Sequence, residues 1–123
     1  MGWGELFGAY WPPLYAFLRK KGRAPEEAAD LIQGLFASLV ESGGLGTVKP
    51  HGARFRSWLL ASLLHHERDV RAKAGAQKRG GAARVVSLDT GSAESRYGPA
   101  VIGGQSPEAA YDRAWALQVL AHA

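Results

Sequence analysis

Apolar residues recur every three or four positions along the first forty residues, in two blocks separated by a short polar turn. The first block, residues 3–21, predicts a helix because side chains at these spacings share one face. Its apolar positions are Trp3, Leu6, Phe7, Tyr10, Leu14, Phe17 and Leu18. Pro12 and Pro13 lack a backbone N–H, so we expect a kink or a restart of the helix near Trp11. Cations followed by Gly22 are typical of a helix end.

The second block, residues 25–42, predicts another amphipathic helix. Pro25 suits a first helical position, and Glu26 and Glu27 suit the positive end of the helix dipole. The apolar stripe consists of Ala28, Leu31, Ile32, Leu35, Phe36 and Leu39. Two glycines follow at once and predict its end. Residues 43–54 then hold four glycines and one proline, which predicts a loop.

A third helical pattern occupies residues 55–79 and changes character along its length. Its first half is apolar and its second half is basic. The apolar positions on one face are Phe55, Trp58, Leu59, Leu63 and Val70. We expect a helix from about Phe55 that weakens beyond Lys73, where glycines begin. One end would anchor in a core while the other carries positive charge into solvent, and we expect the rest of the chain to be organised around this segment.

The remaining residues predict a linker and one more helix. Residues 80–106 are rich in Gly, Ala and Ser, with a short apolar cluster at 85–88 that is compatible with an extended piece. Ser106 followed by Pro107 is a helix start, with Ser as the cap. The helix would run over residues 107–123. It reaches Ala123 without a stop signal, so we expect the chain to be cut off inside or just before another domain.

Three amphipathic helices with short connections predict a compact all-α bundle over residues 1–79. Residues 80–106 would be a linker. The last helix, 107–123, either caps this bundle or belongs to a further domain, of which it would be the first helix.

Charge is unevenly distributed along the chain. The net charge is +4, yet residues 1–53 are neutral and residues 80–123 carry one net negative charge. Between residues 54 and 79 there are seven Lys or Arg against two acids. A rigid helix with this excess suits a polyanion such as nucleic acid.

Several classes of site are disfavoured by composition. The absence of cysteine excludes disulfides, thiolate metal sites and cysteine nucleophiles. His65, His66 and Glu67 cannot converge on one metal ion because successive helical residues point about 100° apart. His65 with Asp69 would supply two ligands without a third. No pairing of a nucleophile with a base can be argued from the spacings, so we expect neither a cofactor nor an enzymatic activity.

We expect a cytoplasmic protein that does not enter a membrane. No apolar run approaches the roughly 18 residues of a membrane span. The N-terminal residues have no basic segment before their apolar positions, as a signal peptide would.

The three helical segments, in this order, resemble region two of bacterial RNA polymerase sigma factors of the extracytoplasmic-function type. The segments are LFGAYWPPLYAFLRKKGR at 6–23, PEEAADLIQGLFASLVES at 25–42 and FRSWLLASLLHHERDVRAKAGAQKR at 55–79. The stretch SLD at 87–89 and the run from Ser106 to Leu117 resemble the linker and the lead-in to region four of that family. The sequence departs from the family at Leu64 and His65, where a basic residue and an Asn are common.

The resemblance implies that the second helix docks on the clamp helices of the largest polymerase subunit. The motif D-L-x-Q-x-x-F carries this implication, and its residues are Asp30, Leu31, Gln33, Gly34 and Phe36. An alternative for Asp30 and Gln33 is a solvated polar edge beside a core stripe. The spacing of Leu31 and Phe36 predicts core residues first, and partner contacts only if the apolar stripe is wider than the bundle needs.

The resemblance also implies contact with the melted minus-ten promoter element through the third helix and its preceding loop. The candidate DNA-binding residues are Lys49, His51, Arg54, Arg56, Trp58, His65, Arg68, Arg71, Lys73, Lys78 and Arg79. The cations would neutralise phosphates, although cations near a helix end are also favourable without a ligand. Trp58 would offer a stacking face to an unpaired base, or belong to the core.

The sequence therefore predicts a sigma-like initiation factor domain whose partners are core RNA polymerase and promoter DNA. An anti-sigma factor is a further partner compatible with the resemblance. A second hypothesis is a helical interaction module that binds polymerase or a regulator without reading DNA. A third, an enzyme acting on nucleic acid, has the least support.

Overall fold

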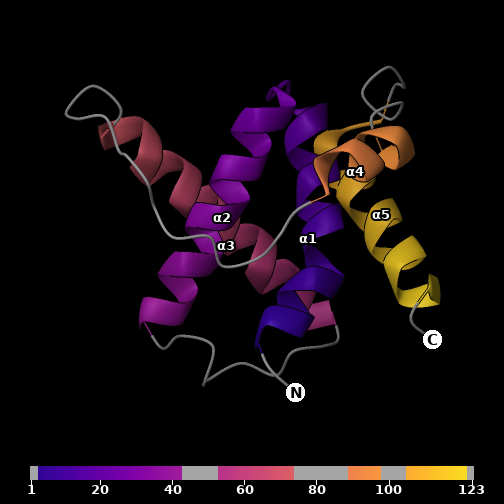
Figure 1. Cartoon of the computed structure of the whole chain (residues 1–123), viewed down its shortest axis with the longest axis horizontal. Coiled ribbons are helices and arrows are strands. Elements are labelled where there is room, and N and C mark those ends of the chain that lie inside the picture. Colours follow the sequence, from indigo (N-terminus) through magenta and orange to yellow (C-terminus); the bar gives the residue numbers. More distant parts are fainter. Residues whose placement is uncertain (1–2, 43–52, 74–88, 98–104, 122–123) are drawn as a thin grey trace.

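The structure, a computed structural model, describes residues 3–42, 53–73, 89–97 and 105–121. Within these residues the regular elements are five α-helices without a strand (Figure 1), which confirms the all-α prediction. They are α1 (Trp3–Lys20), α2 (Pro25–Ser42), α3 (Ala53–Lys73), α4 (Thr90–Tyr97) and α5 (Pro107–Ala121). Four of the five were predicted within a few residues of their ends, and α4 was not predicted.

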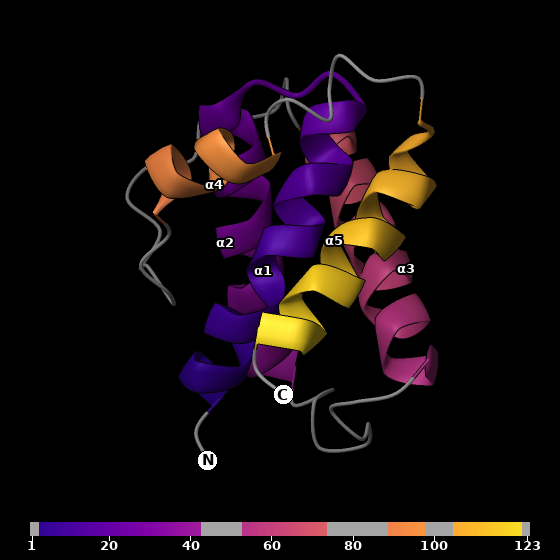
Figure 2. The same cartoon turned by 90° about the vertical axis from the view of Figure 1, so that its right-hand side faces the viewer.

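Helix α1 lies at the centre of the fold. Every residue from Trp11 to Leu18 is buried, on all sides of the helix. In Figure 2, α2 lies on one side of α1 and α5 on the other. Such burial requires neighbours all around the helix, so α1 and not α3 is the element around which the chain is organised.

Two prolines lie inside this central helix, and α1 nevertheless continues through them as a single helix. Of the two outcomes predicted near Trp11, a restart therefore does not occur. Pro12 and Pro13 are both buried. They leave the carbonyls of Gly8 and Ala9 without their usual intrahelical donors.

The turn after α1 follows its sequence signal closely. Gly22 has a positive φ of 101°. Its N–H donates to the carbonyl of Arg19, and the N–H of Arg23 donates to that of Leu18, both at 3.0 Å. This is the Schellman arrangement in which glycine ends a helix. It turns the chain directly into α2.

Helix α5 packs against α1 and belongs to the same core. Tyr111 and Trp115 are buried, and the ring of Trp115 stacks on Tyr10 of α1 with centroids 4.7 Å apart. The same cluster takes in Phe55 of α3, whose ring lies 5.5 Å from Tyr10 and 6.0 Å from Trp115. The sequence left open whether the last helix caps the bundle or belongs to a further domain, and in the structure it packs on the bundle.

Helix α4 lies within residues 80–106, where the sequence predicted a linker. Asp89 caps it by accepting a hydrogen bond from the N–H of Ser92 at 3.0 Å. The apolar cluster at 85–88 lies outside the described residues. Eight residues make a helix too short to be stable alone, so the formation of α4 depends on its contacts with α1 and α2.

Candidate functional site

The outward side of α2 is polar and acidic. Its residues follow helical spacing and face away from the core: Glu26, Asp30, Gln33, Ala37 and Glu41. The three acids are exposed, and Gln33 and Ala37 are half-buried. We call these five residues the α2 face. Acids on a rigid helix give it a negative potential that suits a basic partner surface.

The predicted docking residues divide between this face and the core. Asp30 is exposed and Gln33 is half-buried. Leu31 and Phe36 are 7% and 0% exposed and belong to the hydrophobic core. Their helical spacing turns these two side chains into the core, so a direct contact of either with a partner stays a prediction.

At Gly34, the side chain of His66 from α3 packs closely against the backbone of α2. A Cβ atom built on Gly34 would lie 2.6 Å from Nε2 of His66, well inside van der Waals contact. The imidazole thus occupies the space that a side chain at position 34 would need. The structure gives Gly34 a packing role, whereas the sequence predicted a partner contact.

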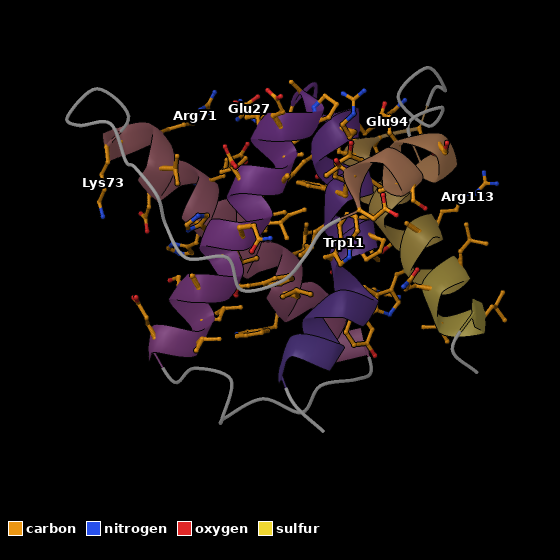
Figure 3. The ribbon with its side chains drawn as sticks, in the orientation of Figure 1. Trp11, Glu27, Arg71, Lys73, Glu94 and Arg113 are labelled. Atoms are coloured by element: carbon orange, nitrogen blue, oxygen red, sulfur yellow. The ribbon has the colours of Figure 1, made fainter. Side chains whose placement is uncertain are left out.

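Helix α3 buries one side and exposes the other. Phe55, Leu59, Leu63 and Glu67 recur every fourth residue and are all buried. Three exposed cations near the C-terminal end form what we call the basic end of α3: Arg68, Arg71 and Lys73. None of them makes an ion pair with an acid within the described part of the chain. Figure 3 shows Arg71 and Lys73 on one side of the molecule and Arg113 of α5 on the other.

Glu67 is a buried carboxylate on the apolar side of α3. It accepts hydrogen bonds from Nζ of Lys21 at 2.7 Å and from Nε of Arg23 at 2.7 Å, with a second bond from the Arg23 guanidinium. Burial by itself raises the pKa of Glu67, but the hydrogen bonds from Lys21 and Arg23 outweigh burial, and the pKa is lowered. The carboxylate ties the turn after α1 to α3, one turn before Arg71.

Sequence reasoning missed this cluster, although a signal for it exists. Glu67 was counted only as an acid that reduces the positive charge of the segment. It follows Phe55, Leu59 and Leu63 at intervals of four, so it continues an apolar stripe. A carboxylate on such a stripe needs a buried cation as partner, and the end of α1 is rich in cations.

Arg56 is directed toward α5. Its Nε lies 3.6 Å from the carboxylate of Asp112, and its backbone carbonyl accepts a hydrogen bond from the Tyr111 hydroxyl at 2.8 Å. The Arg56 side chain is 37% exposed and that of Asp112 61%, so this pair is weak. Arg56 therefore lies apart from the basic end of α3, about three turns away along the helix.

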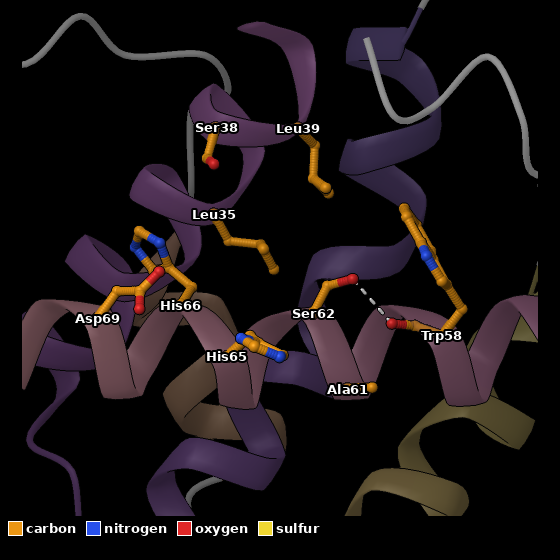
Figure 4. Close-up of a pocket in the computed structure, with 9 residues that line it drawn as sticks. All are labelled: Leu35, Ser38, Leu39, Trp58, Ala61, Ser62, His65, His66 and Asp69. Atoms are coloured by element: carbon orange, nitrogen blue, oxygen red, sulfur yellow. Dashed lines mark hydrogen bonds between the residues drawn. The ribbon is translucent and has the colours of Figure 1, made fainter. Parts of the chain in front are cut away.

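Trp58 and His65 border a groove between α2 and α3 (Figure 4). The groove is lined by Leu35, Ser38, Leu39, Trp58, Ala61, Ser62, His65, His66 and Asp69. Its volume, about 350 Å³, is at the lower end for a small-molecule site. Trp58 is half-buried and stacks on Phe55 with centroids 5.8 Å apart. Its ring thus packs against the core and also borders this groove.

The α2 face and the basic end of α3 meet along a second groove. Its lining includes Asp30 and Leu31 of α2 and Glu67, Val70 and Arg71 of α3. Figure 3 shows Glu27 beside Arg71 at this junction. Glu26 and Asp30 of the α2 face line the same groove as Arg71 of the basic end, so the acidic and basic surfaces adjoin.

The other predicted DNA-binding residues cannot be compared with the structure. Lys49, His51, Lys78 and Arg79 lie outside the described residues, and Arg54 lies in α3 without a described side chain. Among the residues that are described, no group of three or more His and acids could hold a metal ion. Over the same residues, the helices are too short or too polar to cross a membrane.

Comparisons with known proteins find no matching family model, no matching curated protein and no matching solved structure. A functional argument for this chain therefore depends on its own residues. Two features carry it: the order of the three helical motifs, and the position of the α2 face beside the basic end of α3.

Proposed function

We propose that this chain is the promoter-recognition domain of a sigma-like transcription initiation factor. In this proposal, the α2 face docks on core RNA polymerase. The basic end of α3 contacts the phosphates of promoter DNA melted at the minus-ten element. Such a factor acts in the cytoplasm, where the chromosome is.

One observation supports this function best. Asp30 and Gln33, the polar residues of the D-L-x-Q-x-x-F motif, lie on the outward α2 face, and Arg71 of the exposed basic end of α3 lines the same groove as Asp30. A protein held by the α2 face would bring the cations of the basic end to DNA that runs along the polymerase surface. The ion pairs of Glu67 support the arrangement because they hold α3 against the turn before α2.

The DNA contact would be modest. Three phosphate contacts by Arg68, Arg71 and Lys73 correspond to a slope of about −2 in a plot of log affinity against log salt for a single strand. Contacts of this kind position the strand without reading its sequence. The energy needed to open the promoter would therefore be shared with polymerase.

The deciding experiment measures binding of the chain to core polymerase, or to its isolated clamp helices. Asp30→Ala/Gln33→Ala is compared with wild type, and Glu108→Ala is the control, since Glu108 is an exposed acid in the first turn of α5, outside the α2 face. We expect micromolar binding that is lost in the double variant and kept in Glu108→Ala. Absence of binding by the wild-type chain would contradict the proposal.

A second function, a helical interaction module that does not read DNA, is favoured by Arg56. Arg56 was predicted to contact DNA, but its side chain pairs with Asp112 of α5 instead. Charge reversal separates the two functions. If the first function holds, Arg71→Glu/Lys73→Glu should bind single-stranded promoter DNA more weakly than the control Arg113→Glu. If the second function holds, the two variants should have the same DNA affinity. Arg113 is an exposed cation on the opposite side of the molecule.

A further inference from the structure

Helix α4 has little apolar anchorage for an element that covers part of the core. Among its described side chains, only Ala93 is buried, while Thr90 and Glu94 are half-buried. Helix α5, by contrast, buries Tyr111 and Trp115 against α1. Among these described side chains the buried apolar contact is a single methyl group, which holds a short helix weakly, so polar contacts contribute to keeping α4 in place.

Three hydrogen bonds from α1 are accepted by the carboxylate of Glu94 in α4. Its Oε1 accepts hydrogen bonds from the Tyr15 hydroxyl at 2.6 Å and from Nε of Arg19 at 2.9 Å. Its Oε2 accepts a bond from the Arg19 terminal nitrogen at 2.7 Å. The pKa of Glu94 is lowered to about 2, first by the Arg19 hydrogen bonds and then by that of Tyr15. One ionised side chain thus attaches α4 to α1 through three hydrogen bonds.

The two α1 residues that bind Glu94, Arg19 and Tyr15, also make contacts that do not involve α4. Arg19 also donates to the backbone carbonyl of Arg23 at 2.8 Å, which keeps its guanidinium in position. Tyr15 is fully buried within α1 and packs edge-to-face on Trp11 with centroids 5.8 Å apart. Release of α4 would leave a phenol and a guanidinium on α1, which together suit a carboxylate.

We propose that α4 is a strap that opens as a unit while α1, α2, α3 and α5 remain folded, and that the Glu94 carboxylate sets how often it opens. The open state uncovers the Tyr15–Arg19 pair and the apolar surface beneath Ala93. This inference does not depend on the proposed promoter function, because it needs neither polymerase nor DNA.

The absence of native cysteine gives a direct measurement. The variant Ala93→Cys places a thiol under the strap, where it reacts with a thiol reagent only when α4 opens. Ser95→Cys, on the exposed side of α4, reports the unprotected rate. Ala114→Cys, which is buried in α5, reports opening of the whole fold.

We expect Ala93→Cys to react faster than Ala114→Cys and slower than Ser95→Cys. Adding Glu94→Ala should accelerate the reaction of Ala93→Cys by about tenfold or more, since a charged group loses its hydrogen bonds. Adding Tyr15→Phe should accelerate it less, because the Arg19 bonds remain. Neither addition should change the rate of Ala114→Cys by a comparable factor.

Equal rates for Ala93→Cys and Ala114→Cys in every background would overturn the proposal, because α4 would then open only with the whole fold. Hydrogen exchange of the unsubstituted chain is the second measurement, in case a thiol disturbs packing. The N–H of Ala93, bonded to the carbonyl of Asp89 at 3.0 Å, should exchange faster than the amides of α1. Equal protection in both helices would also contradict an independent strap.

Discussion

Helices α1 and α3 are of similar length, yet they differ in how the fold uses them. Helix α1 is buried on all sides from Trp11 to Leu18, and α3 buries one side and exposes three cations at its end. A stretch surrounded by neighbours on all sides has no surface left for a partner. The element that holds this fold together and the element proposed to contact nucleic acid are therefore different, and substitutions should separate them.

The largest effect is expected at the centre of α1. Phe17 is 1% exposed and its ring packs edge-to-face on Tyr111 with centroids 6.3 Å apart. We expect Phe17→Ala to lower the free energy of unfolding by about 3–5 kcal/mol, as measured by urea denaturation. The control Arg68→Ala, on the exposed side of α3, should stay within about 0.5 kcal/mol of wild type. Similar losses in both variants would contradict the contrast between the two helices.

The next largest effect is expected at Glu67, where the two helices are tied together. Glu67→Gln removes the charge that Lys21 and Arg23 surround. Breaking a buried pair in this way should cost about 3 kcal/mol, near the low end because both cations are partly exposed. The control Glu27→Gln removes only the exposed partner of Arg23 and should cost less than about 1 kcal/mol. Urea denaturation at neutral pH measures both.

The same carboxylate predicts a pH dependence. Because its pKa is lowered in the folded state, Glu67 contributes its full stabilisation above the unfolded pKa of about 4.3. That contribution is lost as the pH falls through the folded pKa. The stability of wild type should therefore fall more steeply below about pH 4 than that of Glu67→Gln. Parallel curves for the two proteins would show that Glu67 is not the responsible group.

A smaller effect, with a change of sign, is expected where α2 meets α3. Gly34→Ala places a Cβ against His66 and should destabilise by about 1–2 kcal/mol. In a His66→Ala background the obstacle is gone, and Gly34→Ala should stabilise by about 0.5–1 kcal/mol through helix propensity. A double-mutant cycle measures the coupling. The same sign in both backgrounds would mean that the imidazole moves aside without cost.

The smallest effect on stability is expected where function is proposed. Asp30→Ala and Arg71→Ala change exposed side chains and should alter the free energy of unfolding by less than about 0.5 kcal/mol. We expect the first to weaken polymerase binding and the second to weaken DNA binding, each with little effect on the other activity. Denaturation together with the two binding assays tests this, and a loss of stability in either variant would instead assign that residue to the fold.

The sequence predicted where most helices begin and end better than it predicted which helices pack together. The ends at Gly22 and Ser106 were predicted because capping depends on residues a few positions apart; the N–H of Ala109 donates to the Ser106 hydroxyl at 3.1 Å, as expected. The sequence also proposed the candidate site residues, and the tertiary structure decides which of them reach solvent. Asp30, Arg68, Arg71 and Lys73 are exposed, whereas Phe36 is core and Arg56 faces α5.

Local periodicity by itself determined that this chain is all-α and where four of its helices lie. The tertiary structure decided which helix is central, because the hydrophobic pattern of α1 gives no measure of how many neighbours will surround it. It also decided the partners of Glu67 and Glu94, which lie 44 to 79 residues away along the chain. Ion pairs over such distances form only after packing has brought the helices together, since no pattern within one helix specifies a cation on another.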